Sequence, residues 1–355
     1  MDIEQLLKLG IEQHASDVHI IPNQPPLYRV EGDLVPRNDL GVLSSDMTKK
    51  IIHSMMSDND QSTFIKNLSV DMGVYYPELG NFRVNAFHQC QGIAAIIRIL
   101  PEKVPTLDEL LMPPIIKRLL MLPYGLILVT GPTGCGKSTT LAAMVDYINT
   151  MRTGHILTVE DPIEYMHQSK KGSVNQIQVG RDTLSFSAAL RSSLRQDPDI
   201  IMLGEMRDLE SIRLALIAAE SGHLVISTLH SNTAATTISR IIDVFPTSER
   251  NRIRNLLSET IQGVLCQTLV KKIPSGRIAV LELMLATPAI RNLIREGTIS
   301  HIESTLQTSS EYGMFTLEHH LKELLDKGLI TQAEISTVST SRENMKFNNA
   351  KKTAE

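Results

Sequence analysis

A glycine-rich motif is the feature that most constrains the fold of this chain. Residues 131–139 read GPTGCGKST and fit the pattern GxxxxGK[ST]. The apolar run GLILVT precedes them, and a helical pattern over 137–150 follows. Such a loop needs a strand that enters it and a helix that leaves it, because the loop amides and the helix N-terminus together bind phosphate. The motif therefore predicts an α/β domain that binds a nucleoside triphosphate.

Short apolar runs without alternation recur after the motif, as in strands that are covered on both faces of a parallel sheet. They read HILTVE, DIIMLGE and LVISTL, and RIAVLELML adds a further strand. Helices are predicted over 185–195, 208–221 and 233–243. This alternation predicts a parallel sheet with crossover helices. Thr287 is placed to cap a helix, and a small helical bundle is predicted after it.

The first hundred residues have a different pattern. A helix over 3–14, a strand in ASDVHII, a hairpin in PPLYRVEGDLVP and a helix over 45–58 precede strands at VDMGVYY, GNFRVNAFHQC and GIAAIIRIL. They predict a small α+β domain built on an antiparallel sheet. The predicted organisation is an α+β domain at 1–100, a linker at 101–107, a nucleotide-binding domain with C-terminal helices at 108–341, and a disordered tail at 342–355.

Composition bounds the class of protein. A chain of 355 residues is longer than one core usually covers, which favours two domains. Its three cysteines, at 90, 135 and 266, form no CxxC pair, which argues against a disulfide framework and a structural zinc site. No signal peptide and no apolar run of about 20 residues is found, so we expect a cytoplasmic protein. A net charge of −4 gives no electrostatic reason to expect direct nucleic-acid binding.

The motif assigns roles within the loop. Its glycines let the backbone curl so that successive N–H groups point inward at the phosphates of ATP. Lys137 is expected to reach the β- and γ-phosphates, and the Ser138 hydroxyl to ligate Mg²⁺. For Cys135 two interpretations stay open: a thiol whose pKa is lowered by the helix N-terminus, or a small residue that the loop tolerates. The predicted nucleotide-binding residues are Gly131, Pro132, Thr133, Gly134, Cys135, Gly136, Lys137, Ser138 and Thr139.

Acidic residues follow two of the predicted parallel strands. Glu205 ends DIIMLGE, at the edge where such sheets bind ligands, and is predicted to hold Mg²⁺ with Ser138. Catalysis needs a second carboxylate that is not a metal ligand. TVEDPIEY, at 158–165, supplies Glu160, Asp161 and Glu164 at the end of another strand. The alternative is an ordinary acidic surface turn beside Pro162.

Histidines flank the strand LVISTL. His230 follows the strand, and we expect it at the same sheet edge, where it is a candidate to sense the γ-phosphate. His223 precedes the strand, and functional and structural interpretations of it stay equally open.

These stretches together resemble a known superfamily. GPTGCGKST, TVEDPIEY, IIMLGEMRD and GHLVISTLHSNTA are similar to the Walker A, Asp box, Walker B and His box of the secretion ATPases of type II secretion, type IV pili and type IV secretion. AIRNLIREG, at 289–297, resembles the signature of the PilT-type pilus retraction ATPases. The resemblance implies a PAS-like N-terminal domain and a RecA-like P-loop ATPase domain. It also implies a homohexamer that drives pilus retraction and twitching motility. Such a motor works at the cytoplasmic face of the inner membrane, which it contacts through a pilus platform protein.

The resemblance also implies roles for single residues. Lys137, Ser138 and Thr139 bind phosphate and Mg²⁺, and Glu205 binds the metal. The base is an acid of the Asp box, above all Glu164, with Glu160 as the alternative. Arg83 and Arg98 match arginines of the N-terminal domain that close over the nucleotide, and Arg195 and Arg207 are candidates of second rank.

Some alternatives remain at this point. An accessory retraction ATPase shares every motif. A nucleic-acid translocase on the same core is disfavoured by the charge and by the absence of tryptophan, and a regulatory scaffold by the intact acidic clusters. In AIRNL, the spacing predicts Ala289, Ile290 and Leu293 on the core face. Arg291 and Asn292 are then predicted to be exposed for contact with a neighbouring subunit or a partner.

Overall fold

The computed structural model describes residues 2–30, 32–100 and 103–338, and the chain divides into two compact units. The first unit comprises Met1–Val104 with two later segments, Glu160–Gln168 and Gln176–Ser185. The second unit comprises Pro105–Val159, Ser169–Asn175 and Phe186–Glu355. The predicted linker is described only from residue 103 on, and the predicted tail at 342–355 lies outside the described residues.

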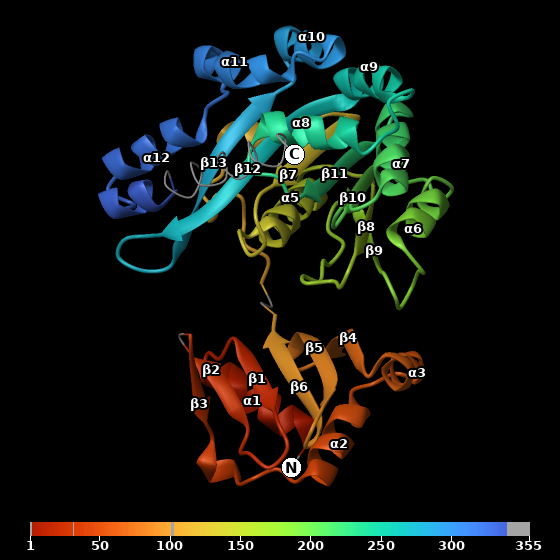
Figure 1. Ribbon diagram of the computed structural model, residues 1–355, viewed down its shortest axis with the longest axis vertical. Helices are drawn as coiled ribbons and strands as arrows, with labels where there is room; N and C mark the ends of the chain where they lie inside the picture. Colours follow the sequence, from red (N-terminus) through yellow and green to blue (C-terminus); the bar gives the residue numbers. More distant parts are fainter. Residues whose placement is uncertain (1, 31, 101–102, 339–355) are drawn as a thin grey trace. The chain divides into compact units, whose positions relative to one another are not determined.

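The first unit is built on a six-stranded antiparallel sheet in the order β3-β2-β1-β6-β5-β4 (Figure 1). Its strands are β1 (Asp17–Ile20), β2 (Leu27–Val30), β3 (Asp33–Pro36), β4 (Ser69–Tyr76), β5 (Gly80–Gln89) and β6 (Gly92–Ile99). Its helices are α1 (Ile3–Glu12), the 3₁₀ turn η1 (Asn38–Leu40), α2 (Ser45–Ser54) and α3 (Asp58–Asn67).

Helices pack on one face of this sheet and make the core of the unit. Leu6 of α1 and Ile52 of α2 are fully buried with Val84 and Ile97 of the strands. The helix predicted over 45–58 is α2, but it ends four residues earlier, at Ser54. The chain instead begins a second helix, α3, because Ser57 and Asp60 form a reciprocal capping box.

The second unit contains a seven-stranded sheet in the order β13-β12-β7-β11-β10-β8-β9. The pairs from β12 through β7, β11 and β10 to β8 are parallel, and β13 joins β12 antiparallel, so the sheet is mixed. Its strands are β7 (Gly125–Thr130), β8 (His155–Glu160), β9 (Ser173–Gln178), β10 (Ile200–Leu203), β11 (Leu224–Leu229), β12 (Ile261–Lys271) and β13 (Arg277–Leu285). The predicted strands are present, and β9 and β12 are additional.

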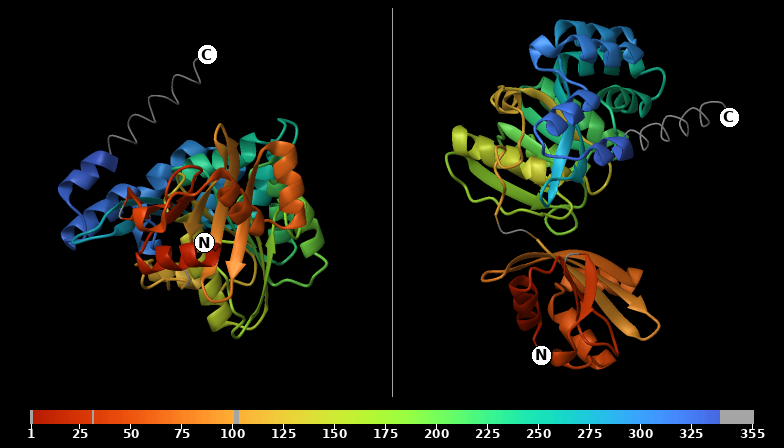
Figure 2. Two further views of the ribbon diagram at one scale, coloured as in Figure 1. Left: turned by 90° about the horizontal axis from the view of Figure 1, so that it is seen from below. Right: turned by 90° about the vertical axis from the view of Figure 1, so that its left-hand side faces the viewer.

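Helices surround this sheet (Figures 1 and 2). Every residue of β7 and β11 is buried, which requires cover on both faces. On one face, Met144 and Ile148 of α5 pack with Ile127 and Val129 of β7. The helices are α4 (Pro114–Leu119), α5 (Lys137–Met151), α6 (Phe186–Ser193), α7 (Leu209–Glu220), α8 (Ala234–Asp243), α9 (Arg250–Thr260), α10 (Pro288–Glu296), α11 (Ile302–Thr308) and α12 (Leu317–Asp326), with 3₁₀ turns η2 (Ile299–His301) and η3 (Ser310–Tyr312).

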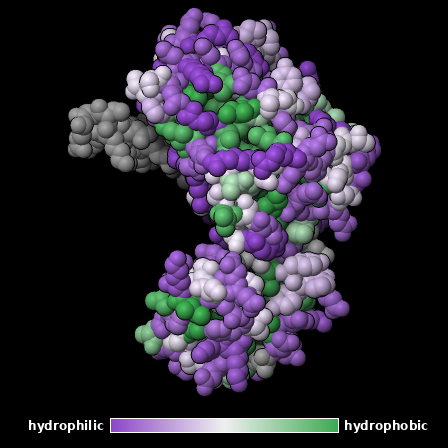
Figure 3. Space-filling model, turned by 90° about the vertical axis from the view of Figure 1, so that its right-hand side faces the viewer, coloured by the Kyte–Doolittle hydropathy of each residue, from purple (hydrophilic) through white to green (hydrophobic). Residues whose placement is uncertain are grey.

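On the face shown in Figure 3, hydrophilic residues predominate, with smaller groups of hydrophobic residues among them. Within the described residues, no helix is both long enough and apolar enough to span a membrane. All three cysteines are free.

Candidate functional site

The glycine loop lies where β7 ends and α5 begins. Gly131, Gly134 and Gly136 have φ angles of 147°, 78° and 86°, which favour glycine over other residues. A Cβ on Gly131 would also collide with the backbone oxygen of Gln267 on β12. Gly136 is the N-cap of α5, so the last amides of the loop lie at the positive end of a 15-residue helix.

Polar side chains at the start of α5 complete this cradle. The Lys137 ammonium donates to the backbone oxygens of Gly131 at 2.9 Å and Pro132 at 3.0 Å, so it lies over its own loop. Ser138 is exposed in the first turn, and Thr139 is half-buried. Inward-curling amides, an ammonium and a helix N-terminus fit the charge of a nucleotide phosphate chain.

Cys135 is a packing residue of the loop. Its side chain is buried, and burial raises the pKa of the thiol more than the nearby Lys137 lowers it. Of the two interpretations left open by the sequence, the structure favours a small, neutral residue that fills space beside Gly131.

Glu205 and His230 meet at the carboxyl edge of the sheet. Glu205 follows β10 and His230 follows β11, two strands that pair in parallel. His230 Nε2 lies 3.0 Å from Glu205 Oε1, and Arg207 Nε donates to Glu205 Oε2 at 2.8 Å. The Glu205 side chain is only 17% exposed, so these two neighbours hold its carboxylate in a defined orientation. Arg207 thus contacts the predicted metal ligand directly.

His223 and Arg195 lie away from the carboxyl edge of the sheet, where Glu205 and His230 meet. His223 precedes β11 at the amino edge, where its backbone oxygen accepts from Gly125 N, at the other end of β7 from the loop. Its ring Nδ1 is 2.9 Å from Ala218 O, so it has a structural role. Arg195 follows α6 and precedes the amino end of β10, whereas Glu205 lies past its carboxyl end.

The Asp box is held by a strand that the sequence did not reveal. Gln176 of β9 donates to Glu160 Oε1 at 3.1 Å and to Tyr165 O at 2.9 Å. Gln178 of the same strand accepts from Ile163 N at 3.4 Å. Glu164, between Ile163 and Tyr165, is half-buried. Two glutamines thereby fix the backbone on both sides of Glu164.

Arg83 and Arg98 are cross-strand neighbours in the first unit. They pair directly between β5 and β6 and lie on the sheet face away from the core, since the adjacent Phe82, Val84 and Ile97 are buried. Arg98 Nε donates to Asp17 Oδ1 at 3.1 Å. The pair concentrates positive charge on this face, with one carboxylate to orient Arg98.

The AIRNL segment forms the first turns of α10, and its predicted faces are partly wrong. Ile290 is buried as predicted, but Ala289 is exposed and the second buried position is Ile294. Arg291 is not free for a partner: it donates four hydrogen bonds, to the oxygens of Ser258, Glu259 and Ala286 and to Gln262 Oε1. These bonds could not be predicted from the sequence, because three of the acceptors are backbone oxygens.

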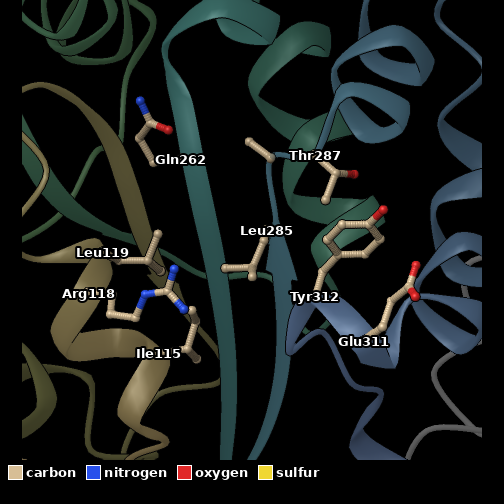
Figure 4. Close-up of a pocket in the computed structure, with 9 residues that line it drawn as sticks. Ile115, Arg118, Leu119, Gln262, Leu285, Thr287, Glu311 and Tyr312 are labelled. Carbon is tan, nitrogen blue, oxygen red and sulfur yellow. The ribbon is translucent and has the colours of Figure 1, made fainter.

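A pocket of about 390 Å³ borders this helix (Figure 4). Arg118, Gln262, Leu285 and Tyr312 are among its lining residues, and Thr287, the N-cap of α10, is another. Gln262 stands at the start of β12, beside the amino end of β7, so the pocket lies at the sheet edge opposite the glycine loop. It is therefore separate from the nucleotide site.

A metal at the loop would depend on few protein ligands. In the parts of the chain that the structure describes, no group of three or more His, Cys, Asp or Glu side chains could hold a metal ion. Mg²⁺ is usually bound through one or two carboxylates plus substrate phosphates. Ser138 and Glu205 fit that smaller set of ligands.

Comparison with known proteins identifies the family. The sequence pattern of the type II/IV secretion system proteins matches residues 1–275. The type IV pilus retraction ATPase PilT of Pseudomonas aeruginosa is 53% identical over 332 residues, which cover 94% of this chain and 96% of that protein. The type IV pilus ATPase PilU of the same organism is 39% identical over 332 residues, covering 93% and 87%.

A crystal structure of the pilus retraction motor PilT with bound ADP is similar throughout, with a TM-score of 0.89 at 44% identity over 94% of this chain and 96% of that chain. This likeness confirms the predicted fold class, an N-terminal domain followed by a RecA-like ATPase domain with C-terminal helices. The chain therefore belongs to the type II/IV secretion system protein family, as a PilT-type member.

Proposed function

We propose that this ATPase is a motor that hydrolyses ATP to disassemble and retract a type IV pilus, and so drives twitching motility. The observation that carries the proposal is the 53% identity to a pilus retraction ATPase along nearly the whole of both chains. The glycine loop and the Glu205–His230 pair at one sheet edge support it, since they provide phosphate binding beside an oriented carboxylate.

Nucleotide binding falls to the glycine loop. Its amides and the N-terminus of α5 bind the phosphates, and Lys137 turns from its own loop carbonyls to the β- and γ-phosphates. Ser138 and Glu205 hold Mg²⁺, which when bound neutralises charge on the phosphates. His230, hydrogen-bonded to Glu205, keeps that carboxylate directed at the site and responds to the terminal phosphate.

Hydrolysis needs an oriented water and further positive charge. Glu164 is the proposed base and Glu160 the alternative. The contact of Glu160 with Gln176 favours Glu164, because Glu160 is already engaged. Arg83 and Arg98 supply the cations that stabilise charge in the transition state. Asp17 keeps Arg98 oriented for this contact.

The proposed assembly is a homohexamer at the cytoplasmic face of the inner membrane, docked on a pilus platform protein. Exposed apolar side chains in the first unit are consistent with subunit contacts: Ile65 is 74% exposed, Leu68 59% and Leu184 94%.

A deletion strain tests this function. Loss of the gene should give hyperpiliated cells that do not twitch, and the gene carrying Glu205→Ala should fail to restore twitching. The similarity to PilU keeps the accessory motor as the second candidate. Cells that lack the gene and retract pili through another retraction ATPase, but twitch less than the wild type, would support the accessory role. Normal piliation and normal twitching would contradict both.

A further inference from the structure

Gln267 lies beside the glycine loop on a strand that the sequence did not reveal. β12 pairs with β7 in parallel, and Cys266 lies opposite Thr130, the last residue before the loop. Gln267 therefore follows at the level of the loop itself. The residue is only 3% exposed, although its side chain is polar.

The Gln267 amide bonds to the loop and to the helix after it. Its Nε2 donates to Cys135 O at 2.7 Å, and its Oε1 accepts from Thr140 Oγ1 of α5 at 2.9 Å. Its backbone oxygen also occupies the space that a Cβ on Gly131 would need. One residue thus contacts the first position of the loop, its later part and the first turn of the helix.

The bond to Cys135 O sets the direction of one loop amide. In a trans peptide, the carbonyl of one residue and the N–H of the next point in opposite directions. Because Gln267 holds Cys135 O toward β12, the N–H of Gly136 points away from β12. A carboxamide is suited to this place because it donates and accepts at once, and both partners belong to buried residues.

We propose that Gln267 is a positioning residue of the phosphate loop, which sets the affinity for ATP by fixing the Cys135–Gly136 peptide and the start of α5. This inference rests on the proposed role of the loop in nucleotide binding. Gln267 does not touch the phosphates; it acts through the backbone that does.

The test is Gln267→Met, which keeps the length of an unbranched side chain and removes both hydrogen bonds. In the purified full-length protein we expect the Kd for a fluorescent ATP analogue and the KM for ATP to rise about tenfold, the equivalent of about one hydrogen bond to a buried partner. The kcat should change less than twofold, since the loop is loosened alike in ground and transition states. Thr140→Val, which removes only one bond, should raise KM about threefold.

Thr260→Val is the matched control. Thr260 is a buried hydroxyl just before β12 that donates to Leu256 O, so its loss should lower stability and leave KM unchanged. An unchanged Kd and KM in folded Gln267→Met would overturn the inference, as would an unchanged KM in Thr140→Val if the first variant does not fold. Lys137→Ala distinguishes failure of the proposed ATP site from failure of the role of Gln267. If the Lys137→Ala protein still binds ATP, the proposed ATP site is wrong. If Lys137→Ala abolishes ATP binding while Gln267→Met leaves it unchanged, only the role of Gln267 is wrong.

Discussion

Replacing Arg291 with alanine should loosen the junction between α9 and β12. The guanidinium donates to two backbone oxygens in the last turn of α9, to Ala286 O and to Gln262 at the start of β12. A net hydrogen bond contributes about 0.5–1.5 kcal/mol, and a cation near the C-terminal end of a helix adds a few tenths more. Because the side chain is half-buried, water replaces part of each bond, and we expect a local loss of about 3 kcal/mol.

Hydrogen exchange measured by mass spectrometry gives the readout. A loss of about 3 kcal/mol makes local opening about a hundredfold more frequent, so amides in peptides spanning 250–265 should exchange about a hundredfold faster in Arg291→Ala. Arg291→Lys should recover only part of the protection, since an ammonium does not reproduce the fork of donors.

Arg295→Ala is the control, because Arg295 is an exposed arginine of the same helix. Protection of 250–265 that stays within threefold of the wild-type value in Arg291→Ala would refute the argument. It would return Arg291 to the partner-contact role that its sequence position suggested.

Three further outcomes are expected. Glu205→Ala should lower ATP turnover by at least about a hundredfold while fluorescent ATP still binds; unaltered turnover would remove Glu205 from the metal site. Arg98→Ala should lower kcat by about a thousandfold in the assembled protein, and Asp17→Asn by less; equal activity in all three proteins would exclude an arginine role. Burial lowers the pKa of His320 to about 4, so the unfolded chain takes up this proton first on acidification. Stability is then full above about pH 6.5 and lost as the pH falls toward 4, by about 2 kcal/mol at pH 5. His320→Gln should flatten the fall in thermal midpoint between pH 7 and 5, and an unchanged slope would contradict this assignment.

The sequence was sufficient where the chemistry depends on strand ends. GxxxxGK[ST] located β7, the loop and α5, and parallel strands were expected to place Glu205 and His230 at the same edge, as they are. The same rule, applied to His223, places it at the opposite edge, because that residue precedes its strand.

Other parts depended on partners distant in the chain. No periodic signal in the sequence marks the polar residues of β9 or Gln267 of β12. Gln267 bonds to Cys135 and Thr140, which lie more than a hundred residues earlier in the chain. The break between α2 and α3 was not predicted, because Ser57, the N-cap of α3, falls inside a run that still has helical spacing. Arg291 of α10 was predicted to be exposed for a partner, but it instead donates hydrogen bonds to backbone oxygens of α9.

The strand β12 has neighbours along both sides, β7 and β13, so it cannot slide alone. Near the start of β12, Gln262 accepts a hydrogen bond from Arg291. Five residues later, about 16 Å along the strand at the usual rise per residue, Gln267 donates to the glycine loop. A displacement of α10 would thus reach, through Gln262, a strand that also holds the ATP-binding loop through Gln267.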